Sequence, residues 1–167
     1  MLIFFKLLPL ILLLNYCAGY KPLYKKQQSH LYKLQSIALV TDKKKASESI
    51  KKQILELIPA RKTVSFIVEI FSTNSTSSTV SNIDTQITGY EIEIIAEVKI
   101  YKRNKQKDVL IYSFTEKEAA PYHLTTNRVL STLANRNNAE YLVVKKLSKN
   151  IYDRIIIFII KENQNVS

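Results

Sequence analysis

Apolar residues recur along the chain with the two periods that distinguish strands from helices. Alternation at every second position predicts a strand from Lys62 to Phe71 and a longer one from Tyr90 to Tyr101. The segment from Asp108 to Glu116 alternates in the same way, and the basic sequence KRNKQKD lies just before it. This order predicts an antiparallel hairpin. A short apolar run, Leu34 to Val40, predicts a further, buried strand.

Two other segments repeat their apolar residues every three or four positions, which is typical of amphipathic helices. The first runs from Lys43 to Ile58, with Asp42 as a candidate cap before it and Pro59 after it. The second is a longer stripe in the C-terminal third, from Leu133 to Phe158. Its β-branched end, Ile155 to Ile160, is expected either to continue the helix against the sheet or to insert between partners.

The order strand, helix, three strands, helix predicts an α+β domain. We expect one layer of about four mostly antiparallel strands, packed by two helices of which the second is long and C-terminal. The polar stretch STNSTSSTVSN after Phe71 is predicted to be a loop or a fraying strand end. We place the single domain at residues 33–162 and a disordered tail at 163–167.

The N-terminus has the pattern of an export signal. Residues 1–16 contain the apolar run MLIFFKLLPLILLL, which is short for a membrane-spanning helix. Cys17 follows at the position where bacterial lipoproteins carry a diacylglycerol, so we predict lipid attachment there. Tyr16 is larger than the small residue that normally precedes such a cysteine, which leaves an uncleaved anchor or soluble release as alternatives. Residues 17–32 are interpreted as the lipid-anchored linker.

The formal net charge of +11 predicts attraction to polyanions such as nucleic acid, an anionic membrane surface or a phosphorylated glycolipid. AT-rich codon bias is an alternative source, because Lys, Ile and Asn are abundant throughout. The three lysines at 43–45 lie where acidic groups would better stabilise a helix start, so they are either binding candidates or products of that bias.

The sequence offers little that could support catalysis. A single cysteine excludes an intramolecular disulfide, and two glycines are too few for the common phosphate-binding loops. The two histidines, His30 in the linker and His123 in a predicted loop, belong to no recognisable constellation. Glu91, Glu93 and Glu97 are expected to form a solvated strand face paired with lysines from a neighbouring strand. We therefore expect no catalytic, cofactor or metal site, and no enzyme.

The octet CAGYKPLY at residues 17–24 resembles the opening of the alphaproteobacterial LptE family of lipopolysaccharide-assembly lipoproteins. The predicted order of elements is similar to that family over essentially the whole chain. EAAPYHLTTN, at residues 118–127, matches only loosely the segment that precedes the final helix in the family.

The resemblance implies a lipid-anchored protein at the periplasmic face of the outer membrane. Such a protein plugs the LptD β-barrel and assists lipopolysaccharide transport without breaking a bond. Its candidate lipopolysaccharide contacts here are basic residues at and near the predicted hairpin turn: Lys99, Lys102, Arg103, Lys105 and Lys107. The alternative is a basic periplasmic lipoprotein that acts as a binding or adaptor module for another polyanionic partner. A nucleic-acid-binding module suits the charge but not the export signal, so no nucleic-acid partner is expected.

Overall fold

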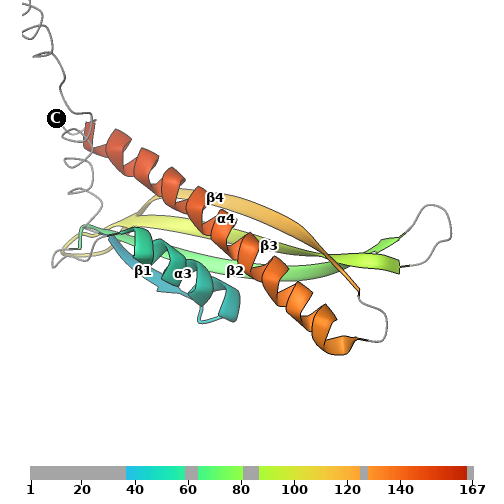
Figure 1. Cartoon of the computed structure of the whole chain (residues 1–167). Helices are drawn as coiled ribbons and strands as arrows, with labels where there is room; N and C mark the ends of the chain where they lie inside the picture. The colour runs from blue at the N-terminus through green and yellow to red at the C-terminus, as the bar shows by residue number, and fades with distance from the viewer. Residues whose placement is uncertain (1–36, 59–63, 81–86, 125–127, 165–167) are drawn as a thin grey trace, which may run out of the picture. The chain divides into compact units, whose positions relative to one another are not determined.

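The computed structural model describes residues 37–58, 64–80, 87–124 and 128–164. They all belong to one compact unit, Leu31–Ser167. The signal segment, Cys17, the linker and the end of the predicted tail lie outside the described residues. The elements are, in chain order, β1 Ile37–Thr41, α3 Lys45–Leu57, β2 Phe66–Val80, β3 Ile87–Lys102, β4 Val109–His123 and α4 Val129–Gln164 (Figure 1).

The strands form one sheet in the order β1-β2-β3-β4. β1 runs parallel to β2, with Ile37 opposite Phe66, because α3 connects the two strands as a crossover. β2 and β3 pair antiparallel, as do β3 and β4. The predicted hairpin and the α+β class, with its mostly antiparallel sheet and long C-terminal helix, are confirmed.

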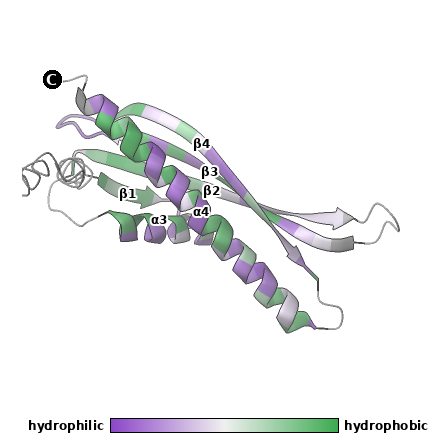
Figure 2. Cartoon of the chain, turned by 45° about the horizontal axis from the view of Figure 1, so that its top comes forward, coloured by the Kyte–Doolittle hydropathy of each residue, from purple (hydrophilic) through white to green (hydrophobic). Residues whose placement is uncertain are grey.

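Both helices cover the same face of the sheet (Figures 1 and 2). The alternating positions of β2 and β3 that face the helices are almost completely buried, as the sequence pattern predicts. On α4 the buried positions follow at spacings of three and four. Burying each such Ile, Leu or Val contributes about 1.5–3 kcal/mol. The fully buried large side chains are Ile50, Ile54, Val68, Ile70, Ile92, Ile94, Val98, Ile100, Leu147, Ile151, Ile155 and Ile159.

The strands are longer than their apolar patterns indicate. β2 continues to Val80, so most of the stretch predicted as a loop or fraying end is regular strand. The prediction was wrong because backbone pairing with β3, from Ser72 opposite Ala96 to Thr79 opposite Gly89, needs no apolar side chains. β4 likewise continues beyond Glu116, and His123 ends this strand rather than lying in a loop.

The helix ends also differ from the prediction at one point. Lys44, not Asp42, occupies the N-cap position of α3, and no side chain caps that helix. Asp42 lies two residues earlier, and its Oδ1 accepts a hydrogen bond of 3.3 Å from the backbone N–H of Lys44. At the other end of the chain, Ile155 and Ile159 are buried within α4. The helical alternative for the apolar segment Ile155 to Ile160 is therefore confirmed.

Candidate functional site

The turn between β3 and β4 brings together three of the five predicted glycolipid contacts. Lys102 ends β3, and the backbone N–H of Arg103 donates to the carbonyl of Ser65 at 2.9 Å, which fixes the turn beside the start of β2. Asn104 Oδ1 accepts from the backbone N–H of Lys105 at 2.7 Å. Lys102, Arg103 and Lys105 line a shallow cavity of about 460 Å³ with Asn104 and residues 64–66. This surface is called the hairpin site below.

The other two predicted contacts lie apart from this cavity. Lys99 lies on the sheet face that the helices leave uncovered, where its Nζ pairs with Glu97 Oε1 at 2.9 Å and lies 5.3 Å from the centroid of the Phe71 ring. The hydrogen bond to Glu97 and the charge of that carboxylate raise the pKa of Lys99. Lys107 is exposed in the turn but does not line the cavity.

Partners within the fold also occupy some of the basic residues. Lys102 Nζ lies 3.2 Å from Glu162 Oε1 on α4, which ties the hairpin to the last turns of that helix. Arg103, Lys105 and Lys107 form no ion pair with any residue in the described ranges. These three carry the hairpin charge that is available to an external anion.

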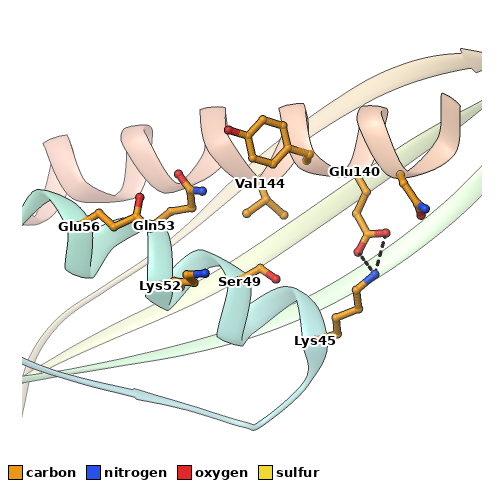
Figure 3. A pocket seen from close by; sticks show the side chains of 9 residues that line it. Lys45, Ser49, Lys52, Gln53, Glu56, Glu140 and Val144 are labelled. Carbon is orange, nitrogen blue, oxygen red and sulfur yellow. Dashed lines mark hydrogen bonds and ion pairs between the residues drawn. The ribbon is translucent and has the colours of Figure 1, made fainter. Parts of the chain in front are cut away.

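Two of the three lysines at positions 43–45 also have partners within the fold. Lys44 Nζ lies 3.2 Å from Asp42 Oδ2 and donates to the carbonyl of Ser72 at 3.1 Å. Lys45 Nζ lies 3.1 Å from Glu140 Oε1, so it joins the start of α3 to α4 (Figure 3). These contacts give two of the three lysines a structural role that their position at a helix start does not reveal.

A groove between α3 and α4 was not predicted from the sequence. It encloses about 380 Å³, and Lys45, Ser49, Lys52, Gln53 and Glu56 of α3 face Glu140, Tyr141 and Val144 of α4 across it (Figure 3). Two lysines and two glutamates line the groove, and the Lys45–Glu140 ion pair spans it. The lining therefore gives no net preference for an anion or a cation.

A second unpredicted cleft lies where α4 begins. It has a volume of about 540 Å³, and Tyr90 and Tyr122 of the sheet line it opposite Arg128 and Arg136. The two tyrosine rings stack with their centroids 5.6 Å apart. A signal for this cleft was present in the sequence, because Arg128, Thr132 and Arg136 recur at the four-residue spacing that places side chains along one helix face.

Among the residues that the structure describes, the glutamate row on β3 forms the predicted ion pair with a neighbouring strand only at Glu93. Lys117 Nζ lies 3.9 Å from Glu93 Oε1, and Glu97 pairs with Lys99 within the same strand. Within the described residues, no group of three or more His, Cys, Asp or Glu side chains could hold a metal ion. No helix in the same part of the chain is long and apolar enough to cross a membrane.

Comparison with known proteins gives a likeness in structure but not in sequence. No protein-family model and no curated protein matches the chain. A protein of Caulobacter crescentus CB15 assigned as a lipoprotein superposes with a TM-score of 0.62 at 8% identity, covering 80% of this chain and 97% of its own. A minor lipoprotein of Acinetobacter baumannii gives a TM-score of 0.56 at 12% identity, covering 74% and 92% of the two chains. Rare lipoprotein B of Shewanella oneidensis gives a TM-score of 0.50 at 12% identity, covering 78% of this chain and 97% of its own.

At these identities the comparisons show the fold alone. The sheet β1-β2-β3-β4, with α3 and the long α4 on one face, is the fold of these bacterial lipoproteins over nearly their whole length.

Proposed function

We propose that the chain is an envelope lipoprotein of the LptE type, anchored through Cys17 at the periplasmic face of the outer membrane. In this role it plugs the LptD barrel and assists the passage of lipopolysaccharide to the cell surface. The observation that carries the proposal is the fold that the chain shares with three solved lipoproteins, over 92–97% of their lengths. The cysteine after an apolar segment and the octet at residues 17–24 agree with it.

The hairpin site supplies the charge for contact with the glycolipid. Arg103, Lys105 and Lys107 are exposed and are not neutralised by a neighbouring carboxylate in the described ranges. Phosphates and acidic sugars accept charge-assisted hydrogen bonds from such groups, and the planar guanidinium of Arg103 can donate two at once. Lys102 and Lys99 already have carboxylate partners, so they contribute less than the three unpaired residues.

The test is direct binding of lipopolysaccharide by the purified full-length chain. Removing the hairpin charge with the triple variant Arg103→Gln, Lys105→Gln, Lys107→Gln is expected to weaken binding roughly tenfold, because three exposed charge contacts of about 0.5 kcal/mol each sum to about 1.5 kcal/mol. The matched control, Lys52→Gln, Lys145→Gln, Lys161→Gln, removes the same charge from exposed positions on the two helices. It should bind nearly as well as the native chain.

Equal losses in both variants would mean that net charge, not the hairpin site, governs binding. Absence of lipopolysaccharide binding by the native chain, together with retained affinity for another polyanion, would favour the adaptor function instead.

A further inference from the structure

The start of α4 carries an exposed apolar cluster that lies outside both the core and the hairpin site. Val129 and Leu130 are each 82% exposed, and Leu133 and Leu124 are exposed beside them. This tip patch, which we define as these four residues with Arg128 and Arg136, joins the beginning of α4 to the end of β4. In Figure 1 the orange first turns of α4 extend past the end of α3, so α3 does not cover them.

The tip patch combines its apolar side chains with positive charge. Arg128 and Arg136 lie on the same cleft wall as Val129 and Leu133. No aspartate or glutamate occurs between Glu118 and Glu140, and these two carboxylates pair with Lys146 and Lys45. Neither arginine forms an ion pair with any residue that the structure describes. The patch is therefore basic as well as apolar.

Exposed leucine and valine beside arginine and tyrosine have the composition of a surface that enters the boundary between lipid headgroups and acyl chains. Apolar side chains enter the acyl region there, arginines meet the phosphates, and tyrosine rings lie at headgroup depth. Tyr90 and Tyr122 line the cleft next to the patch, and Tyr90 is partly exposed. The first turn of α4 contains no acidic residue, so the positive end of the helix dipole also faces any anion at the patch.

We infer that the tip patch docks onto an anionic phospholipid surface, with Val129 and Leu130 inserted and with Arg128 and Arg136 on the lipid phosphates. The exposure of Leu130, which does not line the cleft, favours a membrane surface over one enclosed ligand. The inference goes beyond the proposed function, because it requires neither lipopolysaccharide nor the barrel.

The chain contains no tryptophan, so one introduced tryptophan reports on its own surroundings. The full-length Leu130→Trp variant is reconstituted into vesicles of phosphatidylcholine alone or mixed with phosphatidylglycerol. Brominated acyl chains in the vesicles quench a tryptophan that inserts. The matched control is Leu142→Trp, a 50% exposed apolar residue about three turns farther along α4. Unchanged thermal unfolding of both variants shows that they are folded.

We expect Leu130→Trp to be quenched and its emission to shift to shorter wavelength in vesicles with phosphatidylglycerol, while Leu142→Trp stays unchanged. Adding Arg128→Gln and Arg136→Gln should lower the equilibrium constant for docking by about fivefold for each arginine. Quenching of Leu130→Trp no stronger than that of Leu142→Trp would overturn the inference. So would equal quenching in both lipids, or a concentration-dependent shift without vesicles, which would indicate a second copy of the chain. Lipopolysaccharide binding and barrel association can succeed or fail independently of this result.

Discussion

At the scale of single residues, the turn from β1 into α3 shows how local chemistry determines where an element begins. Lys43 has a φ of 63°, in the left-handed region that side chains with a Cβ rarely adopt. This residue reverses the chain between the end of β1 at Thr41, opposite Ile70, and the start of α3 at Lys45. The Lys44 contacts to Asp42 and Ser72 then hold the turn.

Replacing Lys43 by glycine is expected to raise the free energy of unfolding by up to about 1 kcal/mol. Glycine removes the Cβ penalty of the left-handed conformation, and the greater entropy of the unfolded chain offsets part of this gain. Urea unfolding of Lys43→Gly measures it, with Lys52→Gly, in the middle of α3, as the control that should be destabilised. A loss of stability in Lys43→Gly would show that the lysine side chain has a stabilising contact.

Asp42 should make stability depend on pH in the acidic range. Burial by itself acts to raise the pKa of this carboxyl, but hydrogen bonds from Ser47 and Lys44 and the charge of Lys44 outweigh it, so the pKa is lowered. The folded state therefore binds the proton less tightly than the unfolded state. The stability that Asp42 contributes is complete above its pKa in the unfolded state, about 4. It is lost as the pH falls through the lower pKa of the folded state.

Asp42→Asn should accordingly be less stable than the native chain at neutral pH and should approach it below about pH 4. Urea unfolding of both proteins as a function of pH measures this difference. A constant difference across the acidic range would contradict the assigned role of the carboxylate.

At the scale of elements, a buried hydrogen bond connects α3 to β2. Ser47 Oγ and Ser72 Oγ lie 2.6 Å apart, and both side chains are buried. A buried hydroxyl without a partner costs about 1–3 kcal/mol, whereas the removal of both hydroxyls leaves neither serine unsatisfied and costs only the Ser47 hydrogen bond to Asp42. The pair therefore fixes the position of α3 on the sheet at a small net gain in stability.

A double-mutant cycle tests this connection. Ser47→Ala and Ser72→Ala should each destabilise the fold, and the double variant should lose less than their sum, with a coupling energy of about 1 kcal/mol. Ser47→Ala combined with Ser113→Ala, an exposed residue of β4, serves as the additive control. Additivity in the Ser47/Ser72 pair would show that the hydroxyls act separately.

Gly89 is required by the close approach of β3 and β4. A Cβ at this position would lie 2.9 Å from the backbone oxygen of Tyr122 and 3.2 Å from Thr79 Oγ1. Because a backbone oxygen in a paired strand cannot move alone, we expect Gly89→Ala to cost about 1–3 kcal/mol of unfolding free energy. Thr115→Ala, in the exposed part of β4, is the control that should stay close to the native stability. An unchanged Gly89→Ala would mean that the ladder shifts at no cost.

The elements also show which parts of the fold the sequence can predict. The alternation of Ile92, Ile94, Val98 and Ile100 predicted the buried face of β3 correctly, because burial on one side leaves a period of two. The polar half of β2 could not be recognised in this way. Its pairing depends on backbone groups that every residue carries, so its strand conformation is set by β3 and not by its own side chains.

At the scale of the whole molecule, the pattern of apolar residues predicted the order of strands and helices. The contacts within the candidate site could be assigned only from the structure. The cluster of basic residues at 102–107 predicted the positive charge of the hairpin. Only the structure shows that Lys99 and Lys102 form ion pairs within the described residues while Arg103 forms none there. The cleft beside the tip patch depends on the proximity of Tyr90 of β3, Tyr122 of β4 and the start of α4, which a linear sequence does not display. Lipid attachment at Cys17 concerns a residue outside the described ranges and stays a prediction.

We propose that the chain is a lipoprotein partner of LptD. The most direct measurement is purification of the tagged full-length chain from Gram-negative membranes in mild detergent, followed by mass spectrometry of the complex and of the N-terminal peptide. We expect LptD to co-purify and the mature chain to begin at a diacylated Cys17. A Cys17→Ala variant should lose the lipid mass. An unmodified chain recovered without LptD would contradict this proposal.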